Sequence, residues 1–110
     1  MIAVRMPRRS KYGAQAVVID GIRFASTKEG KRYAELKLLA KAGEIKRLEV
    51  QPRFTFKIGG QLMFTYIGDF KYLTRRGIPM VEDVKGVRTP VYRLKRKIIQ
   101  ATYNIVIVEI

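Results

Sequence analysis

An α/β fold with a mixed central sheet flanked by helices is predicted for this chain of 110 residues. Three observations predict it. Residues 26–43 carry helix-start and helix-end signals, residues 48–85 alternate apolar and polar side chains between turns, and a second helical segment precedes an apolar run at 105–110. A strand reached through a helix returns to the same sheet in parallel, so we expect parallel and antiparallel pairs together.

The N-terminal part predicts a basic arm and a short hairpin. Residues 1–11 are too polar and basic to pack well, so we expect a flexible arm ahead of one domain at 12–110. Asp20 and Gly21 interrupt the apolar residues of 16–24 and predict a tight β-hairpin turn. A short N-terminal hairpin should therefore precede the main fold.

The first helix is predicted from its two ends. Ser26 and Glu29 form a capping box, and Gly43 is a typical helix end. At about 100° per residue, Glu29 lies on the stripe of Tyr33 and Leu36 that should face the sheet. Glu29 therefore either closes the cap at the Ser26 amide or reaches a site on the sheet.

Extended segments follow the first helix. Three runs, 48–56, 62–73 and 78–85, are separated by turns at Gly59-Gly60 and Arg75-Arg76-Gly77. This spacing predicts a three-stranded antiparallel meander.

The second helix is predicted to begin at Thr89-Pro90 and to end near Ala101. Its sequence implies one buried apolar face and one cationic outer face. The apolar residues are Val91, Leu94, Ile98 and Ile99; the cations are Arg93, Lys95, Arg96 and Lys97. The apolar run at 105–110 then forms the last strand.

Composition excludes several kinds of chemistry. The chain has no Cys and no His, which rules out disulfides, thiolate or imidazole metal sites and Ser-His triads. No apolar run approaches the roughly 18 residues of a membrane span. We expect a cytoplasmic protein that acts without a membrane or a small-molecule cofactor, and any catalysis must use carboxylates, Lys, Tyr or hydroxyl groups.

The charge predicts the partner. Twenty-three Lys and Arg against nine Asp and Glu give a net charge of +14, which is typical of proteins that bind nucleic acid. A basic DNA- or RNA-binding module without catalytic activity has the same signature. Charge alone therefore leaves enzyme and binding module open.

One polar pair interrupts an apolar strand. Asp83 and Lys85 are two residues apart, so a strand projects both from the same face. Desolvating these charges costs several kcal/mol unless a partner or a metal compensates. With Asp69 at the end of another strand, the pattern is that of a Mg²⁺-dependent nuclease. The alternative is an exposed ion pair on an edge strand; Glu82 faces the opposite side unless a bulge shifts the register.

The predicted order, helix, three strands, helix, strand (α-β-β-β-α-β), matches the core of the restriction-endonuclease-like fold. The chain also resembles a phage-borne family of small PD-(D/E)XK nucleases, long described only as a domain of unknown function and similar to Holliday-junction resolvases. The segments that carry the resemblance are 10–14, 20–29, 36–39, 43–45, 48–54, 66–70, 81–86 and 92–97. The chain departs from the family pattern at Gly68, where a slightly larger small residue is expected.

The resemblance implies Mg²⁺-dependent hydrolysis of DNA phosphodiester bonds, with Mn²⁺ able to substitute. Asp69, Asp83, Glu29 and the backbone carbonyl of Val84 would hold the metal, and Lys85 would orient the attacking water. It further implies branched or Holliday-junction DNA as the substrate, in phage recombination or DNA processing within the host cytoplasm. The enzyme would be an endonuclease.

DNA contacts are expected from basic residues outside this site. They are Arg8, Arg9 and Lys11 of the arm, Arg75 and Arg76 of a turn, and Arg93, Lys95, Arg96 and Lys97 of the second helix. Incision of both strands of a junction needs two symmetry-related sites, so a homodimer is expected. Its interface is predicted on the aromatic strands around Phe54, Phe56, Phe64 and Tyr66.

Overall fold

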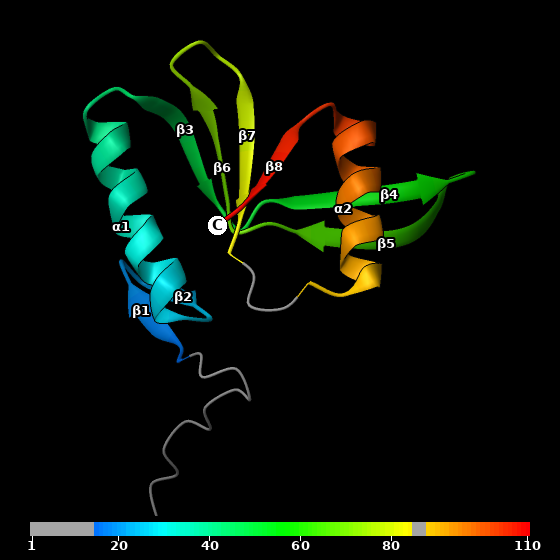
Figure 1. Cartoon of the computed structure of the whole chain (residues 1–110), viewed down its shortest axis with the longest axis horizontal. Coiled ribbons are helices and arrows are strands. Elements are labelled where there is room, and N and C mark those ends of the chain that lie inside the picture. The colour runs from blue at the N-terminus through cyan, green and yellow to red at the C-terminus, as the bar shows by residue number, and fades with distance from the viewer. Residues whose placement is uncertain (1–14, 85–87) are drawn as a thin grey trace, which may run out of the picture.

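The computed structural model describes residues 15–84 and 88–110, and in them the fold is α/β with two helices and a mixed central sheet (Figure 1). The elements in chain order are β1 (Val17–Ile19), β2 (Ile22–Phe24), α1 (Thr27–Lys41), β3 (Ile45–Val50), β4 (Arg53–Ile58), β5 (Gln61–Ile67), β6 (Phe70–Thr74), β7 (Pro79–Asp83), α2 (Pro90–Tyr103) and β8 (Val106–Glu109). The N-terminal arm predicted for 1–11 lies outside the described residues.

The central sheet has the strand order β3-β6-β7-β8. Strands β3, β6 and β7 pair antiparallel, and β8 joins β7 in parallel after the α2 crossover. The prediction of a mixed sheet with a parallel last strand is confirmed. Asp83 pairs with Glu109 at the end of the parallel ladder, so the carboxyl ends of β7 and β8 meet at one edge of the sheet.

The predicted three-stranded antiparallel meander is present as β3, β6 and β7, but the predicted bounds of its strands were wrong. Each of its first two predicted strands is broken, at Gln51-Pro52 and at Gly68, and the outer parts leave the central sheet together as the separate hairpin β4–β5. Gln51 has a positive φ of 54°, and Pro52 has no N–H for a ladder, so the chain bends there. The backbone N–H of Gln51 donates to the carbonyl oxygen of Asp69 at 2.8 Å, and that of Gly68 donates to the carbonyl oxygen of Pro52 at 3.0 Å. These two hydrogen bonds join the two bends to each other.

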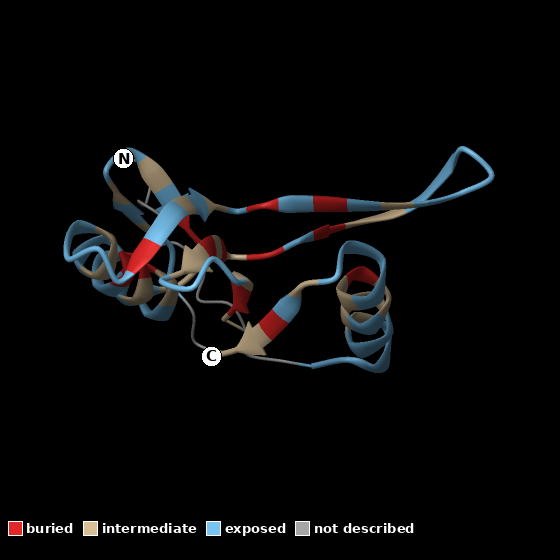
Figure 2. Cartoon of the chain, turned by 90° about the horizontal axis from the view of Figure 1, so that it is seen from above, coloured by how far each residue is buried: buried red, intermediate tan, exposed pale blue. Residues whose placement is uncertain are grey.

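The β4–β5 hairpin extends well beyond the body of the molecule (Figure 2). Its base is buried at Phe54 and Tyr66, whereas its distal half, including Ile58 and Leu62, is exposed. Glycines 59 and 60 turn the chain at the tip with positive φ angles, as expected for a tight hairpin. We refer to this element as the projecting hairpin.

Both helices begin with the predicted caps. The Ser26 hydroxyl accepts from the N–H of Glu29 at 3.1 Å, and the Thr89 hydroxyl accepts from that of Tyr92 at 3.0 Å, with Pro90 at the first helical position. Helix α2 ends at Tyr103, two residues later than predicted. In the described part of the chain neither helix is long and apolar enough to cross a membrane.

Two apolar clusters cover the two faces of the central sheet. Helix α1 and the β1–β2 hairpin pack on one face, around Phe24, Leu36 and Phe70. Helix α2 and the base of the projecting hairpin pack on the other face, around Val81 and Ile99. The central sheet is therefore covered by one core on each face, and the ends of its strands lie between the two cores.

The prediction of a fully buried apolar stripe on α2 was wrong. Ile99 is the buried residue of this helix, whereas Val91 and Leu94 are exposed. The reason is geometric: α2 packs on a narrow two-stranded hairpin, which is too small to cover the whole stripe.

Candidate functional site

Three acidic side chains come together at the edge where β7 ends. Asp83 is the last residue of β7, Asp69 directly precedes β6, and Glu29 lies in the first turn of α1. The start of α1 is held against the same edge, because the Lys28 ammonium donates to the backbone oxygen of Ile110 at 3.0 Å. We call Glu29, Asp69 and Asp83 the carboxylate cluster.

Asp83 is almost completely buried, with 1% of its surface exposed. The Tyr66 hydroxyl, from the base of the projecting hairpin, donates to its Oδ2. Burial raises the pKa of Tyr66, and the hydrogen bond to the Asp83 carboxylate raises it further, so Tyr66 stays a proton donor. The sequence predicted Tyr66 as part of a dimer interface. Its position on the inner face of β5 is the signal that could have indicated a contact with the site.

Asp69 is the residue whose protonation responds to the whole cluster. Burial raises its pKa to about 8; the N–H of Val84, which donates to its Oδ2 at 2.5 Å, opposes this, while the charges of Glu29 and Asp83 add to the increase. The raised pKa of Asp69 thus reflects its burial and the nearby negative charges of Glu29 and Asp83. Such a cluster of acids favours binding of a proton or a cation.

Glu29 contacts both the start of α1 and Asp69. Its backbone N–H donates to Ser26, and its Oε2 accepts from the N–H of Ala25 at 2.7 Å, one residue before the predicted Ser26 amide. The side chain also reaches Asp69, whose pKa it raises through its charge and a hydrogen bond. Glu35, on the exposed face of α1, lies 3.7 Å from the Arg32 guanidinium.

Glu82 points to the opposite face, as strand alternation predicts. It is fully buried and accepts two hydrogen bonds of 2.7 Å from the Arg32 guanidinium and one of 2.6 Å from the Tyr72 hydroxyl. This ion pair joins α1 to the centre of the sheet. The carboxylate of Glu82 is therefore occupied by a structural contact, whereas that of Asp83 faces the cluster.

In the described residues no group of three or more acidic side chains is arranged to hold a metal ion. One oxygen of each cluster residue accepts a hydrogen bond from the protein: Glu29 from Ala25, Asp69 from Val84 and Asp83 from Tyr66. The donor set itself, carboxylate oxygens with a nearby backbone carbonyl, suits a hard cation once the side chains turn. Lys85, the remaining predicted member of the site, lies outside the described residues.

Gly68 holds Asp69 in place through close packing. A Cβ at this position would lie 2.8 Å from Cγ1 of the buried Val81 and 3.4 Å from Cγ of Pro52. The chain crosses directly over β7 here, which favours glycine in this chain over the slightly larger residue expected from the family pattern. Asp69 is the next residue, and its backbone N–H donates to the backbone carbonyl oxygen of Glu82 at 3.0 Å.

One family model covers most of the chain. The model of the family described as "Protein of unknown function (DUF1064)" matches residues 9–109. The chain belongs to this family. Neither a curated protein nor a solved structure matches the chain.

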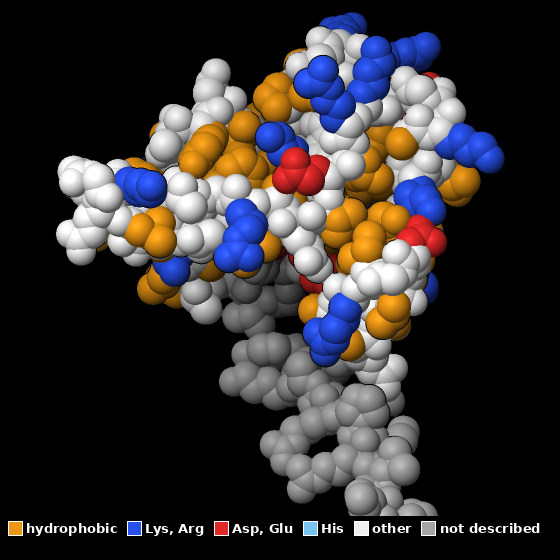
Figure 3. Space-filling view, turned by 180° about the vertical axis from the view of Figure 1, so that it is seen from behind, with side chains coloured by type: hydrophobic (Ala, Val, Ile, Leu, Met, Phe, Trp, Pro, Cys, Tyr) orange, Lys and Arg blue, Asp and Glu red, His pale blue; other side chains and the backbone are white. Residues whose placement is uncertain are grey.

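The basic residues of this DUF1064 domain differ in how far they are available to a ligand. Arg75, Arg76, Arg93 and Lys97 are exposed, although Arg75 also lies 3.5 Å from Glu44. Arg96 turns inward: its Nη2 donates to the Ile107 oxygen at 3.0 Å. Lys and Arg side chains are spread over the face seen in Figure 3, with few acids among them. Arg8, Arg9 and Lys11 lie outside the described residues.

The aromatic residues predicted as a dimer interface of the DUF1064 domain separate into two groups. Phe54 and Tyr66 are buried in the core, each 5% exposed, so they do not offer a surface. Phe56 and Phe64 are half-buried and pack against each other with ring centroids 5.4 Å apart. A homodimer thus stays a prediction, and its interface is not at Phe54 or Tyr66.

Proposed function

We propose that this DUF1064 domain is a metal-dependent endodeoxyribonuclease of the PD-(D/E)XK type, on a restriction-endonuclease-like core. The observation that carries the proposal is the convergence of Glu29, Asp69 and Asp83 at the end of β7, with the pKa of Asp69 raised to about 8. Two of these acids are partly buried and Asp83 is fully buried, and placing like charges together with little water costs stability unless a cation or a proton compensates. It is well suited to holding a divalent cation against a phosphate.

The residues that would hold Mg²⁺, or Mn²⁺ in its place, are Asp69, Asp83, Glu29 and the backbone carbonyl of Val84. When bound, the metal ion supplies Lewis-acid stabilisation of the charge that develops on the scissile phosphate. Their oxygen-only chemistry fits a hard cation, and the side chains of Asp69 and Asp83 accept hydrogen bonds from the Val84 N–H, just after β7, and from Tyr66. Lys85, which follows Asp83 by two residues, would orient the attacking water, as the resemblance implies.

The substrate that we propose is branched DNA of the Holliday-junction type, processed in the cytoplasm of a host cell during phage recombination. The exposed cations Arg75, Arg76, Arg93 and Lys97 suit sequence-neutral contacts with phosphates, which is what recognition of a branch requires. Two copies of the domain would place two sites on one junction. The homodimer is therefore part of the proposal.

A non-catalytic nucleic-acid-binding protein is the second candidate. One observation favours it: in the described residues no group of three or more acidic side chains is arranged to hold a metal ion. On this alternative, the carboxylate cluster would be a proton-binding element of the fold. The two candidates differ in whether Asp83 is needed for cleavage or only for structure.

Cleavage of labelled DNA separates the candidates. The full chain is incubated with Mg²⁺ or Mn²⁺ and a four-way junction, a flap or a linear duplex, and compared with Asp83→Asn and with Glu35→Gln, an exposed acid on α1. We expect cleavage by the parent and by Glu35→Gln, none by Asp83→Asn, and equal junction binding by all three. Cleavage by folded Asp83→Asn contradicts the site; cleavage of duplex alone contradicts the junction preference.

A further inference from the structure

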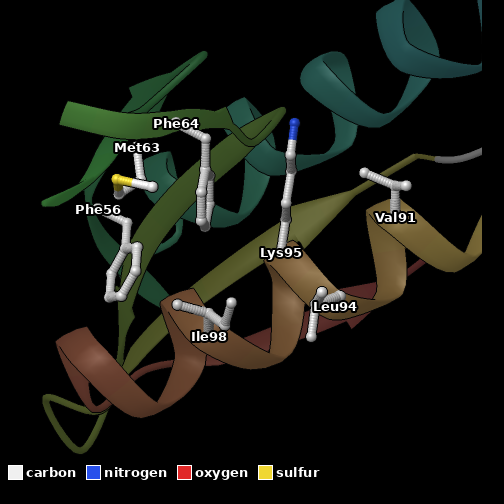
Figure 4. A pocket seen from close by; sticks show the side chains of 7 residues that line it. All are labelled: Phe56, Met63, Phe64, Val91, Leu94, Lys95 and Ile98. Carbon is white, nitrogen blue, oxygen red and sulfur yellow. The ribbon is translucent and has the colours of Figure 1, made fainter. Parts of the chain in front are cut away.

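An apolar groove lies between the projecting hairpin and α2 (Figure 4). Its volume is about 330 Å³, which is in the range of ligand pockets. The hairpin contributes Phe56, Met63 and Phe64, and the helix contributes Val91, Leu94 and Ile98. Leu94 is 59% exposed and Val91 is 61% exposed, so the chain itself leaves much of this apolar surface open to solvent.

The charge around the groove indicates what it binds. The hairpin segment 53–67 and helix α2 contain no Asp or Glu, and both carry cations. The cations are Arg53 and Lys57 on the hairpin and Arg93, Lys95, Arg96 and Lys97 on the helix. Two copies of the chain that met through this surface would bring like charges together, which disfavours a second copy as the occupant. A polyanion with apolar faces is complementary to both properties.

The groove continues toward Tyr66, at the base of the projecting hairpin. A second hollow, of about 360 Å³, shares Val91 and Lys95 with it and is lined further along by Thr65, Tyr66 and Tyr92. Tyr66 is the residue that donates to Asp83. The two hollows thus form one track that runs from Tyr66, the hydrogen-bond partner of Asp83, along β5 and α2 to the apolar groove.

We propose that this track binds an unpaired DNA strand next to the scissile phosphate. The faces of unpaired bases are apolar and pack on aromatic and aliphatic side chains, whereas a paired duplex presents mainly its charged backbone. Lys95 stands between the two sides of the groove, with its ammonium 5.4 Å from the centre of the Phe64 ring, where it can meet a phosphate beside a stacked base. The inference rests on the proposed function, which it deepens by naming the strand that the enzyme holds.

Leu94→Ser tests the groove directly. The binding of fluorescein-labelled oligothymidine and of a blunt duplex is measured by anisotropy, with EDTA present to prevent cleavage. We expect Leu94→Ser to weaken oligothymidine binding about tenfold and to change duplex binding less than twofold. Leu38→Ser is the matched control, because Leu38 is an equally exposed helical leucine, 68% exposed, on α1. We expect it to leave both affinities unchanged.

Other results overturn the inference. It fails if the parent does not bind oligothymidine, or if Leu94→Ser weakens the binding of neither DNA or of both DNAs alike.

Sedimentation of the two proteins tests the competing occupant, a second copy of the chain. A parent dimer that Leu94→Ser dissociates makes the groove a contact between chains. The proposed function is tested separately, since Asp83→Asn is scored by cleavage and Leu94→Ser by binding. Loss of cleavage in Asp83→Asn with unchanged binding in Leu94→Ser keeps the nuclease and removes the strand track.

Discussion

Tyr66 in the projecting hairpin donates its hydroxyl hydrogen to Oδ2 of Asp83 at the end of the central sheet. Both side chains are buried, at 5% and 1% exposure, so the bond is shielded from water. The contact joins the second core of the protein to the carboxylate cluster, and it connects the position of the hairpin with that of the acid.

We expect Tyr66→Phe to lower the free energy of unfolding by about 1–3 kcal/mol, because the buried Asp83 carboxylate loses a donor. Under the proposed function, Mg²⁺ should restore part of this loss by neutralising the same carboxylate. Urea unfolding with and without Mg²⁺ measures both effects. Tyr103→Phe is the control, since its hydroxyl bonds to Thr55 at the surface; an equal loss in both variants would argue against a special role for Tyr66.

The raised pKa of Asp69 predicts how stability depends on pH. It is about 8 in the folded chain against an ordinary value of 3.8, so the folded state holds the proton more tightly than the unfolded state. This stabilisation is fully present below about pH 4 and is lost as the pH rises through 8. In EDTA, the parent should therefore lose stability relative to Asp69→Asn between pH 5 and pH 9. Parallel pH profiles for the two proteins would refute the shift.

The buried ion pair between Arg32 and Glu82 should contribute to stability and not to cleavage. Arg32→Met leaves the Glu82 carboxylate buried with Tyr72, and we expect a loss of about 3–5 kcal/mol. Glu35→Ala removes the exposed partner of Arg32, 3.7 Å away, and should cost less than about 1 kcal/mol. Chemical denaturation compares the two variants, and similar losses would show that the buried pair is not special.

Close packing predicts that Gly68→Ala is destabilising. The added methyl group would meet Val81 at 2.8 Å, and we expect a loss of about 1–3 kcal/mol in unfolding free energy. Val81→Ala makes room at the same point, so the double variant should lose less than the sum of the two single variants. Strict additivity, measured by urea unfolding, would mean that Gly68 is required for another reason.

Short-range signals predicted much of the fold. The Asp20-Gly21 turn and the caps at Ser26 and Thr89 depend on neighbours within a few residues, and all are present in the structure. The split of the meander depends on which strand each segment pairs with, and periodicity does not contain that information. Pro52 and Gly68, each inside a predicted strand, were the local signs of a break.

Only one part of the site could be predicted from the sequence: the face of the sheet toward which each side chain of β7 points. Period-two geometry assigns Glu82 and Asp83 to opposite faces, and the structure has them there, bonded to Arg32 and to Tyr66. Those partners lie 50 and 17 residues away in sequence, so their identity follows from tertiary packing alone. The same limit applied to α2, where an apolar stripe in the sequence does not reveal how much of it the rest of the chain covers.

The projecting hairpin leaves the central sheet and re-enters it at adjacent points, since Gln51 and Gly68 are fastened to Asp69 and Pro52. Beyond the cross-strand pair of Phe56 and Phe64, the residues of the hairpin are largely exposed. The hairpin can therefore change in length without moving the acids. The molecule therefore has two parts: a sheet edge that carries the acids, and an extension that is largely exposed. Under the proposed function, a longer or shorter extension would change the reach of the domain on its substrate while the acids keep their register.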